Sequence, residues 1–406
     1  MRSRLTVPAV FVALAAAFPL ACSGTERDPV AGTGGTRAVT PGPGGQDPIG
    51  QDPGFVEGSR PDAGPQEEEA CAPDPGRFDA PGNVCDDDQD GTVDNAAEVC
   101  DSALAVDANA EAFAKALGLC HKVTGPSDPK WGVVSATYTK GYNQSAGPAA
   151  GQHGILTAFG SAVAPREGDA FGVLSTGWAR AYDGESGTPT FKKGGGMQGL
   201  QLLGGKVPPG YPKSSPGCPA IPLAMDIAVV KLEIKTPKNA QGFQFDFDFY
   251  SGEWPEYVCS PYNDGFIAYL KSKAFNNGAP ENISFDAKGS PVSVNNAFFD
   301  RCTPNAQTGC SGGGAQQTAA CAGGEGELVG TGFEARGQYC GGSSTVGGGA
   351  TGWLTSQAPV QGGETITLEF YIWDSGDARY NSSVLLDNFR WVPKPVTVTT
   401  TRPPPK

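Results

Sequence analysis

The sequence contains only two histidines among its 406 residues, and this scarcity limits the chemistry available to the chain. His121 and His153 stand apart and no Cys-x-x-Cys pair occurs, so a zinc site is not expected. No Gly-x-Ser-x-Gly motif marks a nucleophilic serine, and the glycine-rich run 194–205 lacks the Lys-Ser/Thr ending of a phosphate-binding loop. These absences argue against zinc enzymes, serine hydrolases and nucleotide-binding proteins.

Basic residues are also in short supply, with 29 Lys and Arg against 43 Asp and Glu and a formal charge of −14. Such a chain repels nucleic acid and anionic membranes and attracts cations, so no nucleic-acid partner is expected. Apolar residues make up 38% of the chain, whereas Gly (59) and Pro (35) are abundant. This composition is typical of a turn-rich protein and does not fit an all-helical fold.

The N-terminus carries the sequence pattern of an export signal. An apolar run follows the basic start, but it is short and is interrupted by Pro8 and Pro19, so we interpret residues 1–21 as a signal peptide. Cys22 follows, and its surroundings resemble a bacterial lipoprotein cleavage site, which implies acylation of Cys22 and attachment to the outer membrane or cell surface. Pro19 stands where such sites usually have Leu, so secretion without a lipid is the alternative.

The regions on either side of the expected folded part are low in large apolar residues. Residues 22–80 cannot bury enough surface to offset the entropy of ordering, so we expect a disordered tether. Residues 394–406 are rich in Pro and Thr and contain no apolar helix, so anchoring to the cell envelope is expected at the N-terminal end.

Export places the cysteines in an oxidising compartment. Without Cys22, ten of the eleven cysteines remain, which allows five disulfides. Connectivity does not follow from sequence, beyond a local expectation that Cys85 pairs with Cys100 and that the cysteines from Cys302 to Cys340 crosslink one long loop region.

Hydrophobic periodicity predicts the fold class. One short helix is expected near residues 108–118, with Asp107 as its N-cap and with Phe113 and Leu117 on one face. After Trp131 the period changes to two, most clearly in the alternating phenylalanines of 241–251 and in 229–235 and 364–374. Weaker strand candidates lie elsewhere between 134 and 391. We therefore expect an all-β protein, a jelly-roll-like antiparallel β-sandwich over 126–393 with long disulfide-crosslinked loops, preceded by an Asp-rich segment and the helix over 81–125.

The Asp-rich segment 85–100 has the spacing of a calcium loop. Carboxylates stand at alternate positions, a glycine stands where such a loop turns sharply, and a threonine offers its carbonyl. Ala97 replaces the bidentate glutamate of an EF-hand, so the segment is not one. It resembles the Asp-rich, cysteine-flanked metal-binding motif of secreted bacterial proteins and the calcium repeats of thrombospondin. The alternative is a solvated acidic linker. The expected calcium ligands are Asp86, Asp88, Asp90, Thr92 and Asp94.

Two blocks, 247–270 and 373–391, resemble the choice-of-anchor L domain of bacterial surface proteins over roughly 130–392. The shared pattern is a Phe-alternating strand, a Ser-x-Glu-Trp-Pro-Glu-Tyr-Val turn, Asn-Asp before an apolar strand, and a late Asp-x-Gly-Asp followed by Ser-x-Val. The resemblance implies an exported domain without established catalytic activity, attached to the cell by an anchor that varies between proteins. The residues that carry it are Ser251, Glu253, Trp254, Pro255, Glu256, Tyr257, Asn263, Asp264, Asp374, Gly376, Asp377, Ser383 and Val384.

If the strands that end near Asp248 and Asp374 are sheet neighbours, four acids gather at one end of the sandwich. Glu253, Asp264, Asp374 and Asp377 would then bind a second metal or a polar ligand. The alternative is a loop corner in which these carboxylates cap backbone amides.

The sequence therefore predicts a non-enzymatic, calcium-stabilised surface protein that acts as an adhesion, ligand-binding or structural envelope module. An extracellular glycan or protein is the expected ligand class. The alternative is a carbohydrate-active hydrolase that uses acids of the 251–264 loop, favoured if Trp and Tyr line an open groove beside them.

Overall fold

The structure, a computed structural model, describes most of the chain from Cys71 onward. The chain divides into two units, Met1–Gln66 and Glu67–Lys406, and every described residue belongs to the second. The expected signal peptide, Cys22 and most of the expected tether therefore lie outside the described residues. Among the described residues, no helix has both the length and the apolar character of a membrane span. The described residues are 71–149, 151–180, 205–296, 298–311, 316–334, 339–342 and 346–403.

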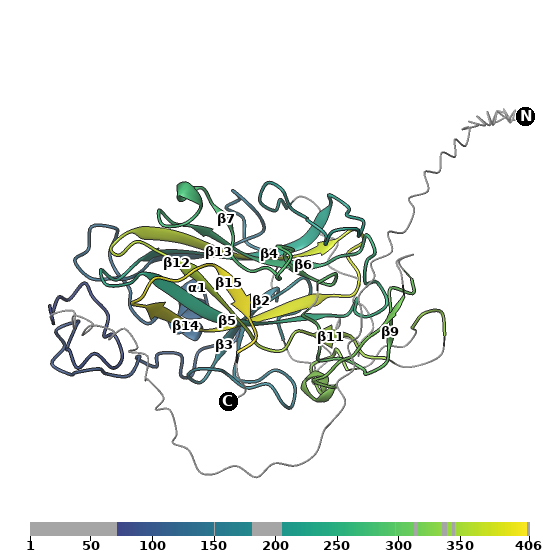
Figure 1. Cartoon of the computed structure of the whole chain (residues 1–406), viewed down its shortest axis with the longest axis horizontal. Helices are drawn as coiled ribbons and strands as arrows, with labels where there is room; N and C mark the ends of the chain where they lie inside the picture. Colours follow the sequence, from purple (N-terminus) through teal and green to yellow (C-terminus); the bar gives the residue numbers. More distant parts are fainter. Residues whose placement is uncertain are drawn as a thin grey trace, which may run out of the picture. The chain divides into compact units, whose positions relative to one another are not determined.

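Two antiparallel sheets stack as layers, with β13, β4 and β6 in one layer and β5, β14 and β3 in the other (Figure 1). The first sheet has the order β1-β4-β13-β6-β7, and β8 also pairs with β6. Its strands are β1 (Gly132–Thr139), β4 (Ala224–Lys235), β6 (Gly265–Lys271), β7 (Glu281–Asn282), β8 (Val292–Ser293) and β13 (Thr365–Ser375).

The second sheet has the order β15-β12-β5-β14-β3-β2, and β11 also pairs with β5. A separate two-stranded pair, β9 with β10, and two short 3₁₀ helices lie in the loops. The second sheet contains β2 (His153–Leu156), β3 (Phe171–Ser175), β5 (Gly242–Ser251), β11 (Gly349–Ala350), β12 (Leu354–Pro359), β14 (Ser382–Val392) and β15 (Thr399–Thr401). The loop elements are η1 (Asn276–Gly278), β9 (Gln307–Thr308), β10 (Gln317–Thr318) and η2 (Gly326–Leu328).

The main hydrophobic core fills the space between the sheets and confirms the predicted alternation. All four phenylalanines of β5 are fully buried, and the ring of Phe247 lies 5.0 Å from that of Phe266 in the facing sheet. On β4, Val230, Leu232 and Ile234 are fully buried, whereas the intervening charged residues are partly exposed. The all-β sandwich expected from the sequence is therefore the observed fold.

The outer face of the second sheet is also partly covered, which the strand pattern did not indicate. Loop residues Phe159 and Phe333 pack on Tyr250, and Asp246 and Asp248, on the same outer face of β5, are at most 1% exposed. Alternation therefore identified the side of each β5 residue correctly, but the polar side of this strand does not face solvent.

The predicted helix is α1 (Ala110–Ala116), and it docks on β3 and β1. Phe113 and Leu117 are fully buried, as expected from their spacing. Gly172 of β3 allows this contact, because a Cβ there would lie 2.3 Å from the Phe113 ring. The expected N-cap was wrong: Asn109 accepts the Ala112 amide at 3.0 Å, whereas Asp107 pairs with Arg180.

The described residues contain five disulfides, as the cysteine count predicted, but the expected Cys85–Cys100 pairing was wrong. Cys85 bonds back to Cys71 and Cys100 bonds forward to Cys120, beyond α1, so no bridge closes the Asp-rich loop on itself. Two interleaved bridges crosslink the 302–340 region, as expected. The other pairs are Cys218–Cys259, Cys302–Cys321 and Cys310–Cys340.

Two expected boundaries differ from the structure. Residues 71–80, assigned to the tether, are folded, because Phe78 and Ala80 lie in the main core and the Phe78 amide donates to Asn239 Oδ1 at 3.0 Å. In the expected C-terminal tail, β15 pairs with β12. The first segment packs on the core and the second adds an edge strand, and neither has the apolar content that would indicate a folded segment from sequence.

Candidate functional site

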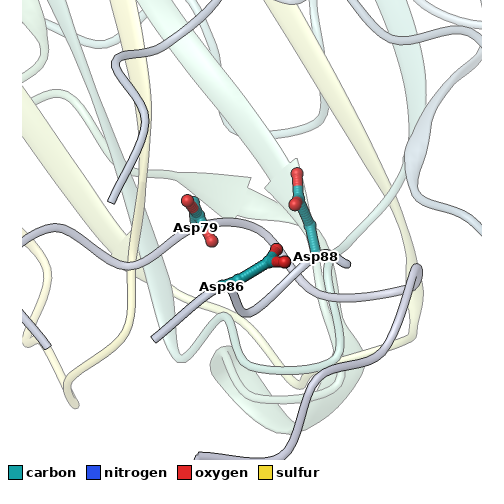
Figure 2. Close-up of side chains that lie close together, drawn as sticks. All are labelled: Asp79, Asp86 and Asp88. Atoms are coloured by element: carbon teal, nitrogen blue, oxygen red, sulfur yellow. The ribbon is translucent and has the colours of Figure 1, made fainter. Parts of the chain in front are cut away.

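Three carboxylates meet in the Asp-rich segment. Oxygens of Asp79, Asp86 and Asp88 lie within 4.8 Å of one another, and all three residues are partly buried (Figure 2). Two ligands of one calcium ion, each bound at 2.3–2.6 Å, lie at most about 5 Å apart. The three oxygens therefore have the spacing that a single calcium ion requires.

The structure brings together Asp86 and Asp88 of the expected ligands, whereas Asp90 and Asp94 lie outside the group of three carboxylates. Asp90 accepts from Thr92 N at 2.7 Å and from Asn95 Nδ2 at 2.8 Å. Asp94 accepts from the amides of residues 82, 83 and 84 at 3.0–3.2 Å and thereby closes the preceding turn. Asp86 and Asp88 both accept from Asp90 N at 3.1 Å, so the loop folds around their carboxylates.

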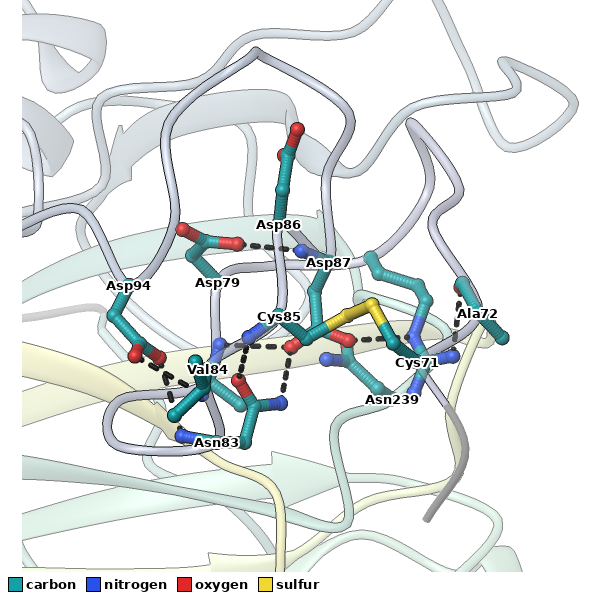
Figure 3. Close-up of a disulfide and its surroundings, with 12 residues drawn as sticks. Cys71, Ala72, Asp79, Asn83, Val84, Cys85, Asp86, Asp87, Asp94 and Asn239 are labelled. Carbon is teal, nitrogen blue, oxygen red and sulfur yellow. Dashed lines mark hydrogen bonds and ion pairs between the residues drawn. A yellow bond between two sulfur atoms is a disulfide. The ribbon is translucent and has the colours of Figure 1, made fainter. Parts of the chain in front are cut away.

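Asp79 is the member of this cluster that sequence reasoning missed, because it lies in the segment taken as tether. Its carboxylate accepts from Asp87 N at 2.7 Å (Figure 3). It also accepts from Asn95 N at 2.9 Å, which ties residues 79, 87 and 95 together. The Cys71–Cys85 bridge holds the two ends of the turn that carries Asp79. The aspartates of this turn are visible in the sequence, but only the Cys71–Cys85 pairing shows that the turn lies beside the Asp-rich loop.

Asp87 shows the opposite behaviour from its neighbours, since it turns inward. It is 2% exposed, lies 3.5 Å from the Arg77 guanidinium and accepts from Asn83 Nδ2 at 2.6 Å. This paired carboxylate anchors the loop, while Asp86 and Asp88 on either side face the cluster. Burial raises the pKa of Asp88, and the negative charges of Asp90, Asp79 and Asp86 raise it further against the hydrogen bond from Asp90 N. A cation among these carboxylates would relieve this repulsion.

A second group of acids gathers at one end of the sandwich. The premise behind this prediction was wrong, because β5 and β13 lie in different sheets. Glu253 follows β5 in the second sheet, whereas Asp374 ends β13 and Asp264 precedes β6 in the first. The acids still converge, because the two sheets face each other and their loops meet here. The Asp264 backbone amide donates a long hydrogen bond of 3.5 Å to Glu253 Oε2.

Hydrogen bonds hold Asp264 and Asp374 inside this end of the sandwich. Asp264 Oδ1 accepts from Ser375 N at 3.1 Å and its Oδ2 accepts from Ser382 Oγ at 2.7 Å. Asp374 Oδ1 accepts from Ala378 N at 3.0 Å. These contacts fit the loop-corner alternative, in which carboxylates cap backbone amides.

Electrostatics at this corner are unfavourable for ionised carboxylates. Burial raises the pKa of Asp264 well above its usual range, and the neighbouring charges of Asp374 and Glu253 raise it further. Burial likewise raises the pKa of Asp374, with further contributions from Asp377 and Asp226 and opposition from the Ala378 amide. Asp226, which sequence reasoning missed, lies on β4 beside β13 and is fully buried.

Asp377 lies at the margin of this group. It is partly exposed, and its carboxylate accepts from Arg379 N at 3.2 Å. Its charge raises the pKa of Asp374, so it lies near the others but closer to solvent.

The acids and the tryptophan of the 251–264 loop are buried, so they do not line an open groove of the kind expected of a carbohydrate-active enzyme. Glu253 is 1% exposed and Glu256 is 7% exposed, and Glu256 accepts from Ser311 Oγ. Trp254 is 7% exposed and stacks on Phe299 with ring centroids 4.6 Å apart. Buried acids cannot flank a glycosidic bond, so these contacts favour a structural role for the loop over hydrolysis.

Comparison with known proteins identifies the region that contains the second acidic group. Residues 220–389 match the family model of the choice-of-anchor L domain, which is a surface-associated module. The match begins after β3, so it is shorter than the 130–392 resemblance and excludes the Asp-rich segment. No curated protein and no solved structure matches the chain. The chain therefore carries a choice-of-anchor L domain over residues 220–389.

Proposed function

We propose that the chain is an exported cell-surface protein whose β-sandwich acts as an adhesion, ligand-binding or structural envelope module, stabilised by calcium at Asp79, Asp86 and Asp88. The observation that carries this proposal is the convergence of three carboxylate oxygens within 4.8 Å. The surface association follows from the choice-of-anchor L domain.

Calcium suits this cluster for two reasons. The donors are all hard carboxylate oxygens on a loop with half-buried side chains, which leaves room for the waters or carbonyls that complete a calcium shell. Asp90 and Asp94 lie outside the group of three carboxylates and accept from local amides, so in this proposal they support the loop. Asp79 takes their place as a ligand and links the folded start of the chain to the loop.

A melting experiment tests the calcium site. Calcium at 100 times its dissociation constant stabilises a single site by about 2.7 kcal/mol, so the melting midpoint should rise with calcium and fall with chelator. Asp88→Asn should reduce this rise. Asp90→Asn is the matched control, because it removes the charge of a neighbouring carboxylate that accepts hydrogen bonds from residues 92 and 95. Equal calcium responses in the two variants and the wild type would exclude the site.

Attachment to the envelope is proposed through acylation of Cys22. Support comes from the apolar run before it and from the surface-associated domain after it. Cells that express the chain should incorporate labelled palmitate into it and retain it in the membrane fraction. Cys22→Ser should abolish the label and release the protein; an unlabelled wild-type chain in the medium would show that the protein is secreted.

The burial of Trp254 and Glu253 favours a structural or protein-binding role over sugar binding. Binding of the purified protein to a glycan array separates these roles. Reproducible binding to a defined glycan would contradict the structural interpretation.

A further inference from the structure

Four acidic side chains lie almost fully buried at one end of the sandwich. Asp226, Asp264 and Asp374 are 0% exposed and Glu253 is 1% exposed. Three of these residues stand on or beside the adjacent strands β4, β13 and β6, and a register shift in β13 next to Asp374 alters the strand at this point. Glu253 enters from the second sheet. The topology therefore brings acids from both sheets into one interior corner.

One oxygen in this corner has no partner. Asp374 Oδ2 is buried without a hydrogen bond, although Oδ1 of the same carboxylate binds Ala378 N. The charges that act on Asp374 are those of Asp377 and Asp226, and its own charge acts on Asp264, so the unpartnered oxygen lies among carboxylates. Buried polar atoms are nearly always satisfied, and an unsatisfied carboxylate oxygen indicates a missing partner.

The charges of this corner also lack compensation. No Lys or Arg of the described residues forms an ion pair with Asp264 or Asp374, and the hydrogen bonds that they accept come from Ser375, Ser382, Ala378 and the Asp377 amide. Two buried, unpaired negative charges are unstable in a protein interior. One divalent cation carries the charge that neutralises both.

We propose that Asp264 and Asp374 are the charged ligands of an internal calcium ion that Asp226 and Glu253 flank. The donor set is entirely oxygen, which suits calcium, and extracellular modules bind this ion with dissociation constants of about 10⁻⁴–10⁻³ M. The site joins the start of β6 and the end of β13 to the turn after β5, so the ion links the two sheets.

Binding requires a small rearrangement. In the described part of the chain, three carboxylate oxygens come within 4.8 Å at Asp79, Asp86 and Asp88 and not at this corner. Like charges without a cation repel, so the carboxylates of this corner must approach one another to reach a common ion. The alternative is a corner of protonated carboxylic acids that binds no ion.

The two acidic groups lie at opposite ends of the sandwich, which allows separate measurement. Asp226 lies near the start of β4, whereas the segment that holds Asp79 contacts Lys238 and Asn239 after the end of that strand. From Asp226 to Lys235 the strand extends roughly 30 Å at about 3.3 Å per residue. Substitutions at one group should therefore leave the other intact.

The test is equilibrium dialysis of the purified chain against calcium, with bound metal measured by atomic emission. The double variant Asp86→Asn with Asp88→Asn removes two of the three carboxylates of the first cluster without touching the core. We expect this variant to retain one bound calcium per chain and a calcium-dependent rise in melting midpoint. Absence of bound calcium in this folded variant overturns the proposal, whatever the wild type binds, and so separates this site from the first.

Addition of Asp374→Asn to the double variant should remove the remaining ion. Asp387→Asn is the control, since Asp387 is a fully buried carboxylate of β14 that accepts from Arg166 N at 2.6 Å and lies outside the acidic corner. The control should keep the ion. Retention of bound calcium in the Asp374 variant would show that the ion sits elsewhere and would contradict the assignment.

Discussion

Removal of the Cys71–Cys85 bridge tests the link between disulfide pairing and the calcium cluster. The bridge spans 14 residues and encloses Asp79, and Asp86 follows Cys85 directly. The double variant Cys71→Ser with Cys85→Ser should therefore lose stability and also lose the positions of two proposed ligands. A variant that breaks Cys100–Cys120 is the matched control, because that bridge spans a similar 20 residues but encloses none of the three acids.

The expected magnitudes follow from loop closure. A crosslink over a loop of this length stabilises the folded state by about 3 kcal/mol through the entropy of the unfolded chain. For a folded unit of the size of Glu67–Lys406, this loss lowers the melting midpoint by about 4 °C. Both double variants should show this loss. The calcium-dependent rise should be reduced only when Cys71 and Cys85 are replaced, because Asp79 is then free to leave Asp86 and Asp88.

The assay combines calorimetry, with calcium and with chelator, and peptide mapping of the oxidised wild type. Mapping should recover Cys71 linked to Cys85 and Cys100 linked to Cys120. Recovery of a Cys85–Cys100 peptide would refute the pairing. An unchanged calcium response in the Cys71/Cys85 variant would refute the claim that this bridge positions the cluster.

Three further predictions concern the sandwich. Burial raises the pKa of Asp248 to about 8 from 3.8, so between these pH values the folded state holds a proton that the unfolded chain releases. The free energy of unfolding, measured with urea, should therefore fall by up to about 1.4 kcal/mol per pH unit as the pH rises from about 4 to 8, and Asp248→Asn should flatten this slope. Phe247→Ala should lower the free energy of unfolding by about 3–5 kcal/mol, because the ring is fully buried between the sheets. Gln244→Ala on the same strand is the control and should lower it by under about 0.5 kcal/mol, so equal losses in the two variants would contradict the packing. Asn109→Ala should cost about 1 kcal/mol through loss of the helix cap, and no loss would exclude that cap.

The strands could be predicted from sequence because one physical signal dominates them. A period of two puts Phe243, Phe245 and Phe247 on one side, and burial between sheets is the main way to remove three adjacent aromatic rings from water. The period of two does not show whether the other side of the strand faces solvent or is covered. Asp248 is buried because loop residues such as Phe333 cover the outer face, and loops carry no periodicity.

The site residues were harder to predict because they depend on long-range contacts. Asp86 and Asp88 stand in a recognisable spacing, but Asp79 joins them through a bridge whose pairing the sequence leaves open. Asp226 reaches Asp374 through the pairing of β4 with β13, nearly 150 residues apart in the chain, and it sits in the apolar first half of β4. Local spacing identifies ligands that share a loop, whereas ligands on separate strands require the topology.

The position of the first cluster suggests why the chain has an acidic segment outside the matched domain. If the protein is attached to the envelope through Cys22, a pulling force on it reaches the described residues first at Cys71. The first crosslink of the described residues is the bridge from Cys71 to Cys85. Phe78 in the core and the Lys238–Asp74 ion pair then attach this segment to the sandwich. Calcium between Asp79 and Asp86 would reinforce the same junction. With calcium bound, the acidic segment would act as a clamp at the N-terminal end of the described fold, and an ion in the buried corner at the opposite end would stabilise the sandwich itself.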